Sequence, residues 1–187
     1  GGEILRDASG EPTGLLRENA EELVDAALKA DLAKRTPAEA TADLDRRIDL
    51  AVEECLSKGV TTLHDAGVSF DVVARYRERA EAGTLGIRVY AMLSAPNELL
   101  EKEAARVRVV GAGRNHLTVR AVKRLADGAL GSRGAWLLAP YADAPGSTGP
   151  NTYSMKELER TAEIAAANGY QVAIHAIGDR ANREVLD

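Results

Sequence analysis

The sequence predicts an α/β fold with about four parallel βα units, and two observations lead to this expectation. Short β-rich runs alternate with longer runs of helical periodicity from residue 37 to the end of the chain. Strands connected in this way pair in parallel through right-handed crossovers, in an open doubly wound sheet or in a (β/α)8 barrel. A complete barrel takes roughly 250 residues. The 187 residues of this chain therefore predict a single domain that holds part of such an architecture.

A lead-in segment, residues 1–36, comes before the βα units. It has a turn-rich start at residues 7–12 and then a helix-like run over residues 15–32. The first well-marked helix begins at residues 36–39 (TPAE), which supply an N-cap, a proline at the first helical position and a capping-box glutamate, and Gly59 ends it. Apolar residues recur along this helix at helical spacing, so one face must pack on another element, most simply a sheet.

The remaining elements, over residues 37–187, follow in regular order. We expect strands at residues 60–64, 87–93, 118–125 and 171–176. We expect one helix that ends near residue 82 and three further helices at residues 97–110, 154–168 and 180–186. The segment 127–150 is rich in Gly, Ala and Pro, and it is too long for an ordinary connection. We therefore expect it to be a functional loop.

Composition excludes several classes of function. The net charge is −5, with 28% charged residues of both signs interspersed and no basic cluster, so nucleic acid is not an expected partner. No apolar run approaches the roughly 20 residues of a spanning helix, and no signal peptide is visible, so a cytoplasmic protein without a membrane role is expected. The single Cys55 lies on the apolar stripe of a predicted helix and is interpreted as a buried thiol.

Polar residues lie at the carboxyl ends of three predicted strands, which is where the active sites of parallel α/β folds are found. These residues are His64, Asp65, Lys123, Asp127, His175 and Asp179. Strand alternation places Lys123 on one face with Val119, Ala121 and Leu125, directed into an apolar layer. A charged amine there is costly. Neutralisation by a carboxylate such as Asp127 would relieve the cost, and so would carboxylation of the amine by carbon dioxide, which makes it an anionic oxygen ligand for metal ions.

Each of these residues also has a purely structural interpretation. His175 could be a hydrogen-bonded core histidine, His64 could orient its loop, and Lys123 could be a salt-bridged strand residue. His116 precedes its strand, at the wrong end, and is interpreted as a surface residue. The three histidines form no His-x-His or His-x3-His pair, so the sequence contains no self-contained zinc site.

Four segments, in order along the chain, resemble the amidohydrolase superfamily, in particular its amidohydrolase 3 branch of YtcJ-like enzymes and N-substituted formamide deformylases. They are the lead-in at 6–16 (RDASGEPTGLL), residues 59–67 (GVTTLHDAG), Val122-Lys123 with 127–135 (DGALGSRGA), and residues 175–182 (HAIGDRAN). The resemblance implies a (β/α)8 barrel and a hydrolase that cleaves non-peptide C–N bonds of a small amide-type substrate with metal-activated water.

The resemblance also assigns roles to individual residues. Lys123 matches the carboxylated lysine that bridges metal ions, and His175 matches the metal-binding histidine of the fifth strand. Ser132 and Arg133, with the rest of the long loop, would line the substrate pocket. His64, Asp65, Asp127 and Asp179 are also expected as lining residues. The cofactor implied is divalent metal, with zinc expected, as one or two ions.

The chain departs from the family pattern in one respect. The superfamily places a His-x-His pair on the first strand, a further histidine on the sixth and an aspartate on the eighth, and none of these is present. We therefore expect a central fragment that lacks several ligands and the general base, and that is inactive alone. The alternative is a non-catalytic half-barrel module that forms a homodimer through its open sheet edges.

Overall fold

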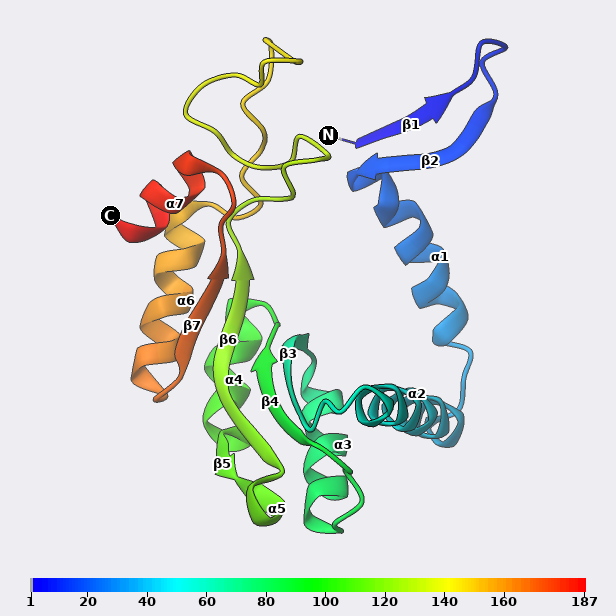
Figure 1. Ribbon diagram of the computed structural model, residues 1–187, viewed down its shortest axis with the longest axis vertical. Coiled ribbons are helices and arrows are strands. Elements are labelled where there is room, and N and C mark those ends of the chain that lie inside the picture. The colour runs from blue at the N-terminus through cyan, green and yellow to red at the C-terminus, as the bar shows by residue number, and fades with distance from the viewer. Residues whose placement is uncertain (1) are drawn as a thin grey trace. The chain divides into compact units, whose positions relative to one another are not determined.

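The computed structural model describes residues 2–187, which form two compact units, residues 1–50 and 51–187 (Figure 1). Each unit is described by itself, and the single domain expected from the sequence stays a prediction. The first unit contains a two-stranded hairpin, a short 3-10 helix and two helices. Its elements are β1 (Gly2–Arg6), β2 (Pro12–Glu18), η1 (Asn19–Glu21), α1 (Glu22–Leu32) and the start of α2 (Pro37–Ser57).

The hairpin corrects the expected helical run at residues 15–32. Residues 12–18 form β2, which pairs antiparallel with β1, and α1 begins only at Glu22. The turn between the strands is built on Asp7, whose carboxylate accepts hydrogen bonds from the backbone amides of Ser9 (2.9 Å) and Glu11 (3.0 Å). Pairing with β1 satisfies the backbone of residues 12–18, so strand pairing overrides the helical pattern there.

The predicted start of α2 is confirmed. The Thr36 hydroxyl accepts from the Glu39 amide (3.3 Å), and the Glu39 carboxylate accepts from the Thr36 amide (2.8 Å), which completes a capping box. Donation from the Thr36 amide and the Thr36 hydroxyl to the Glu39 carboxylate lowers the pKa of Glu39. Gly59, beyond the end of α2, has a φ of +73°. Ile48 is the buried member of the predicted apolar stripe, whereas Leu56 is 49% exposed.

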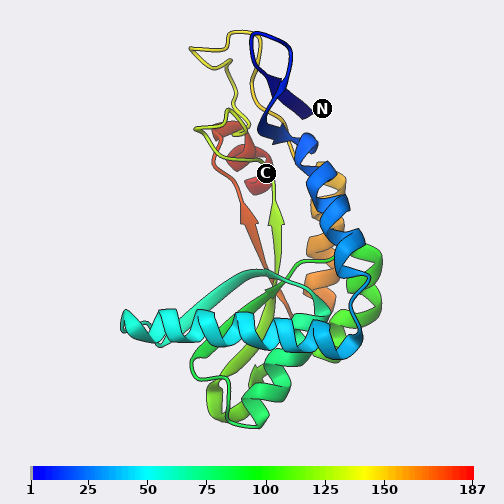
Figure 2. The same ribbon diagram turned by 90° about the vertical axis from the view of Figure 1, so that its right-hand side faces the viewer.

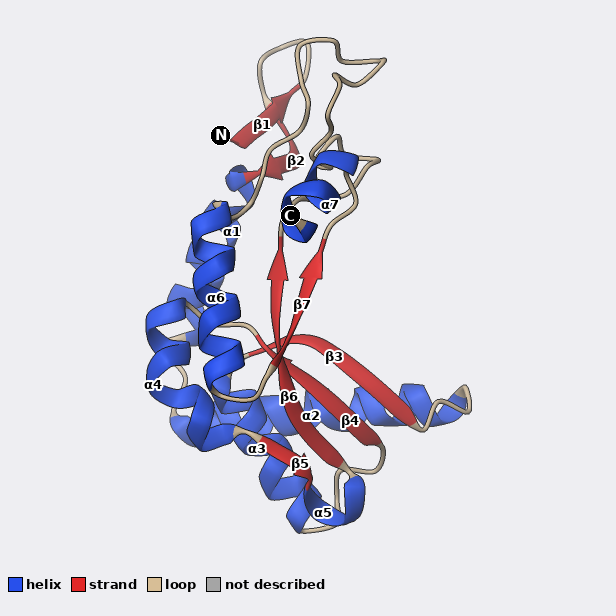
Figure 3. Cartoon of the chain, turned by 90° about the vertical axis from the view of Figure 1, so that its left-hand side faces the viewer, coloured by secondary structure: helices blue, strands red, loops and turns tan. Residues whose placement is uncertain are grey.

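The second unit is a sheet of parallel strands connected by helices, which confirms the predicted α/β fold class (Figures 1 and 3). Adjacent parallel strands follow chain order, as in a barrel: β3 (Thr62–Val68), β4 (Arg88–Leu93), β6 (Leu117–Leu125) and β7 (Gln171–His175). The helices are α3 (Phe70–Glu81), α4 (Asn97–Val107), α5 (Ala112–Asn115), α6 (Met155–Ala167) and α7 (Asp179–Leu186).

In this unit, two boundaries differ from the prediction by more than two residues. β3 extends past His64 to Val68, because its backbone continues to pair with β4 as far as Val68 opposite Leu93. The helix expected over residues 97–110 ends at Val107, and Val109–Gly111 form the short strand β5, in which Val109 pairs antiparallel with Val119.

The two faces of this sheet differ. One face is covered by helices and carries the core, and its buried residues include Val89, Ala91, Leu93, Val119 and Val122. The other, which we call the open face, carries residues of β4, β6 and β7 that share register across the strands: Tyr90, Met92, Ala121, Lys123, Leu125, Gln171, Ala173 and His175. The register between β4 and β6 shifts by one residue, because Ala91 pairs with Val119 and Met92 with Ala121. This bulge at Arg120 corrects the expectation that Val119 shares a face with Lys123.

The loop of residues 127–150 lies beyond the carboxyl ends of β6 and β7 (Figures 1 and 2). Within the loop an isolated bridge joins Tyr141 and Ala144. The expected long loop is thus present at the end of the sheet where the polar strand-end residues lie. Among the helices of residues 2–187, we find none with the length and apolar content needed to cross a bilayer.

Candidate active site

Lys123 and His175 lie on the open face of neighbouring strands, close to the carboxyl end of the sheet. Lys123 pairs with Ala173 and Leu125 with His175, so the two predicted metal ligands are one side-chain repeat apart along the sheet. The Lys123 ammonium donates to the carbonyl oxygen of its neighbour Arg124 (2.8 Å). Burial lowers the pKa of Lys123, because a charged amine loses hydration there. Lys123 is therefore easier to deprotonate than a lysine in water.

Neutralisation of Lys123 by Asp127 finds no support in the positions of the two groups. Asp127 is fully buried and its carboxylate accepts three backbone hydrogen bonds, from the amides of Trp136 (2.8 Å), Ile177 (2.9 Å) and Gly178 (2.7 Å). These bonds join the long loop to the turn between β7 and α7. Asp127 therefore organises the two loops.

Asp179 makes a second connection between the same loops. Its carboxylate accepts from the amide of Leu138 (2.9 Å) in the long loop and from the amide of Arg180 (2.8 Å) in the first turn of α7. The Arg180 guanidinium lies over the Trp136 ring, 4.7 Å from its centroid. The long loop is thus fastened to α7 by a carboxylate and a cation–π contact.

His64 lies on the open face of β3, next to Tyr90 of β4. The two rings stack with centroids 5.0 Å apart, and the Tyr90 hydroxyl donates to Gln171 of β7 (2.5 Å). A row of polar and aromatic side chains therefore crosses the open face from β3 to β7. This position agrees with a lining role for His64.

Asp65 lies on the opposite, helix-covered face. Its carboxylate accepts from the Tyr76 hydroxyl of α3 (2.7 Å). Burial, together with this hydrogen bond and the charge of Asp65, raises the pKa of Tyr76. Because Asp65 faces away from Lys123 and His175, its position favours a structural role over the lining role that we expected.

Ser132 and Arg133 are exposed residues of the long loop. The Ser132 hydroxyl donates to the Ala129 carbonyl (3.1 Å), and Arg133 forms an ion pair with Asp143 (2.9 Å) inside the same loop. Hydrogen bonding to Asp143 raises the pKa of Arg133. Both side chains therefore stabilise the shape of the loop, and these hydrogen bonds and this ion pair stay within it.

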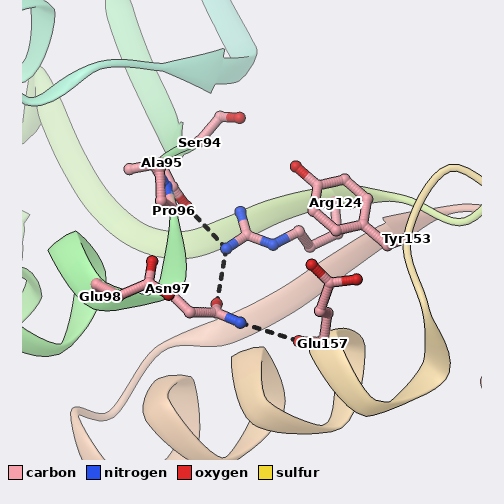
Figure 4. Close-up of a pocket in the computed structure, with 8 residues that line it drawn as sticks. All are labelled: Ser94, Ala95, Pro96, Asn97, Glu98, Arg124, Tyr153 and Glu157. Atoms are coloured by element: carbon pink, nitrogen blue, oxygen red, sulfur yellow. Dashed lines mark hydrogen bonds between the residues drawn. The ribbon is translucent and has the colours of Figure 1, made fainter.

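A buried arginine was missed by the sequence interpretation. Arg124 is 2% exposed, and its guanidinium donates to Thr161 Oγ1 (3.0 Å), the Ala95 carbonyl (2.8 Å) and Asn97 Oδ1 (2.9 Å), and also to the carbonyl of Lys123 (3.1 Å). Figure 4 shows it between the start of α4 and Tyr153, at a cavity of about 400 Å³. Alternation along β6 puts Arg124 on the opposite face of the sheet from Lys123. This alternation was the signal in the sequence that could have identified a buried arginine.

The described residues supply part of a metal site. Lys123 and His175 share one face, and a carboxylated lysine and a histidine are both suitable donors for a divalent ion. Among residues 2–187, no group of three or more His, Cys, Asp or Glu side chains is close enough to hold a metal. The donors present thus fit a metal ion, but further ligands are needed to complete its coordination.

The chain matches known proteins along its whole length. A family model described as "Amidohydrolase family" matches residues 1–187. The chain is 33% identical over 192 residues to the YtcJ protein of Bacillus subtilis, and 29% identical over 194 residues to N-substituted formamide deformylase of Arthrobacter pascens. It covers 34% of the length of each, with all of its own residues matched. The chain therefore spans about a third of the length of these relatives.

A solved structure has a similar fold. An uncharacterized metal-dependent hydrolase from Pyrococcus horikoshii superposes with a TM-score of 0.77 at 31% identity, over 97% of this chain and 35% of that one. The match confirms the predicted fold class, an α/β fold that corresponds to part of a (β/α)8 barrel. The predicted family resemblance is likewise confirmed.

Proposed function

Because this chain belongs to the amidohydrolase family, we propose that it forms the central part of a metal-dependent hydrolase acting on non-peptide C–N bonds of small amide-type substrates. One observation carries the proposal: Lys123 and His175 project from adjacent strands onto the same open face, one side-chain repeat apart, at the carboxyl end of the sheet. Function gathers at this end in barrel enzymes. The names of the relatives, which include a formamide deformylase and metal-dependent hydrolases, support the reaction class.

Lys123 would bind metal as its carboxylated form. The neutral amine attacks carbon dioxide, so that a C–N bond forms while one C=O π bond opens and its electron pair moves to oxygen. The nitrogen then loses a proton to water, which leaves a carbamate anion. This step needs the unprotonated amine, so the lowered pKa of Lys123 favours it. The carbamate oxygens and the His175 imidazole would then hold a divalent ion, for which zinc is the expected identity. When bound, such an ion lowers the pKa of water toward neutrality and polarises a substrate carbonyl.

The chain's own residues would shape the substrate side of the site. His64 and Tyr90 form a stacked aromatic floor on the open face. The long loop, fastened by Asp127 and Asp179, would form one wall beyond the strand ends. The remaining metal ligands and the general base would come from parts of the enzyme outside these 187 residues, so the chain alone would have no turnover.

The metal content of the purified chain tests the ligand assignment. After incubation with zinc and bicarbonate, mass spectrometry should find bound zinc that is lost in both Lys123→Ala and His175→Ala. Matched controls are Lys102→Ala, an exposed lysine of α4, and His116→Gln, at the amino end of β6. Carbon-13 NMR with labelled bicarbonate should show a carbamate signal that disappears only in Lys123→Ala. Zinc retained by both ligand variants would contradict the assignment.

Turnover tests the reaction class. The complete reading frame that contains this chain should hydrolyse N-formyl or N-acyl amines, and the 187-residue chain should not. The alternative function is a non-catalytic half-barrel module that dimerises through its open sheet edges, β3 and β7. A chain that sediments as a dimer and takes up no zinc would favour this alternative.

A further inference from the structure

A fourth group approaches the Asp127 carboxylate, beyond the three backbone amides that it accepts. The His175 Nε2 atom lies 3.8 Å from Asp127 Oδ1. The His175 side chain is 33% exposed, whereas Asp127 is fully buried. One nitrogen of the imidazole therefore faces a fixed carboxylate at the end of the sheet.

The backbone amides hold this carboxylate in place. Oδ2 accepts from Trp136 and Gly178, and Oδ1 accepts from Ile177, two residues beyond His175. A buried carboxylate needs such donors to offset its lost hydration. Because three bonds fix its orientation, Asp127 cannot turn away from the imidazole without breaking at least one of them.

A carboxylate facing one nitrogen selects the tautomer of a neutral imidazole. A proton on Nε2 is attracted to Oδ1, whereas a lone pair on Nε2 is repelled by it. The 3.8 Å separation exceeds a normal N–H···O hydrogen bond of roughly 2.7–3.2 Å, so the carboxylate acts mainly through its charge at this distance. The bias leaves the lone pair on Nδ1.

We propose that Asp127 is a positioning residue for His175: it keeps the proton on Nε2 and leaves Nδ1 as the nitrogen that binds a metal ion. Asp127 would thereby have a role different from the lining role expected from the sequence. The metal-binding part of this inference rests on the proposed function, whereas the tautomer does not. Carboxylates behind ligating histidines commonly serve this purpose.

Nitrogen-15 NMR of the metal-free chain at alkaline pH tests the proposal directly. Long-range couplings distinguish the two tautomers of a neutral imidazole, and the chain has only three histidines to assign. In the unchanged chain, His175 should be mainly the Nε2–H tautomer. A mainly Nδ1–H tautomer would overturn the proposal, whatever the behaviour of any variant.

The Asp127→Asn variant supplies the second test. Its amide oxygen can still accept from Trp136 and Gly178 at the Oδ2 position, which places the NH2 group where Oδ1 stood. That group turns a partial positive charge toward Nε2 and loses the bond from the Ile177 amide, so the bias is reversed and the His175 tautomer should shift toward Nδ1–H. The matched control is Asp143→Asn, which changes an exposed carboxylate of the same loop that pairs with Arg133. A folded Asp127→Asn chain with an unchanged tautomer would refute the positioning role.

Zinc titration separates this inference from the proposed function. With Zn²⁺ and bicarbonate as the probe, Asp127→Asn should bind about 10-fold to 100-fold more weakly, whereas Asp143→Asn should bind like the unchanged chain. Equal weakening in both variants would overturn a specific role for Asp127 in metal binding. If the unchanged chain takes up no zinc, the metal assignment fails, and the tautomer experiment alone decides whether Asp127 positions His175.

Discussion

Two basic residues that are neighbours in β6 lie on different faces of the sheet and differ in their burial and hydrogen bonding. Arg124 points to the helices, is 2% exposed, and donates four hydrogen bonds to neutral oxygen atoms of β6, α6 and the start of α4. Lys123 precedes it on the open face and donates to the Arg124 carbonyl. The difference indicates that the arginine of the covered face stabilises the fold, whereas the lysine of the open face is the group to which we assign a functional role in our proposal.

The largest expected effect is the loss of Arg124. In Arg124→Met, the acceptors at Thr161, Asn97 and Ala95 lose their donor, and we expect the free energy of unfolding to fall by about 2–4 kcal/mol. Water that enters the adjoining cavity would offset part of this cost. Urea unfolding measures the change, with Arg120→Met, an exposed arginine of the same strand, as the control. Equal stability of the two variants would show that the network contributes little.

A close contact between the loops should give the next largest effect. A Cβ atom added at Gly178 would lie 1.8 Å from the Trp136 carbonyl oxygen, although the φ of Gly178 is an ordinary −63°. Gly178→Ala should therefore push the long loop away at a cost of about 1–3 kcal/mol. Trp136 is the single tryptophan, so its fluorescence emission should shift to longer wavelength.

Gly131 provides the matched control for this substitution. It lies in the same loop, and a Cβ atom added there would meet no atom within 4 Å. Gly131→Ala should leave both the stability and the tryptophan emission unchanged. If Gly178→Ala also left the emission unchanged, the position of the loop would not depend on this contact. The hydrogen bonds of Asp127 and Asp179 would then be what holds the loop in place.

Much of the fold followed from patterns that are local in sequence. The strand and helix order from residue 37 onward was predictable because β-rich runs are bounded by Gly, Pro and capping residues. Strand alternation also predicted that Ala121, Lys123 and Leu125 share one face of their strand, as they do in β6. The resemblance then added the expected roles of Lys123 and His175. The register of β6 and β7 places these two residues on the same face of the sheet.

What could not be predicted depends on contacts distant in sequence. The bulge at Arg120 changes the face of Val119, and no turn residue marks it. The distant partners of Arg124 are residues 95, 97 and 161, and those of Asp127 are residues 136, 177 and 178. A carboxylate after a strand predicts an active-site position, but only the fold reveals that Asp127 accepts backbone amides and that Asp65 accepts from α3.

A smaller effect is expected at Asp65 on the covered face. In Asp65→Asn the neutral amide oxygen can still accept from Tyr76, but the charge is lost, so the pKa of Tyr76 should fall while burial keeps it above its ordinary value. The stability cost should be about 1 kcal/mol. Ultraviolet titration of the tyrosines measures the pKa change, and Glu81→Gln, exposed at the end of α3, is the control. An unchanged titration curve would contradict the assigned contact.

The smallest change, and one of opposite sign, is expected from Lys123→Met on the open face. Burial lowers the pKa of Lys123 in the folded chain below the ordinary value of 10.5. Below both values the lysine is charged in the folded and unfolded states, and the fold bears the cost of burying that charge. As the pH rises from the folded pKa to the ordinary value, this cost disappears and stability increases.

The methionine variant removes that cost at every pH. In buffer free of metal and bicarbonate, Lys123→Met should therefore be more stable than the unchanged chain at neutral pH, by less than about 1 kcal/mol, and the difference should shrink toward alkaline pH. Urea unfolding over a pH series measures this, with Lys102→Met as the exposed control. Addition of zinc and bicarbonate should reverse the order, because only the lysine can form the carbamate. A methionine variant that is less stable at neutral pH without these additions would mean that Lys123 stabilises the open face, and the contrast between the two faces would be lost.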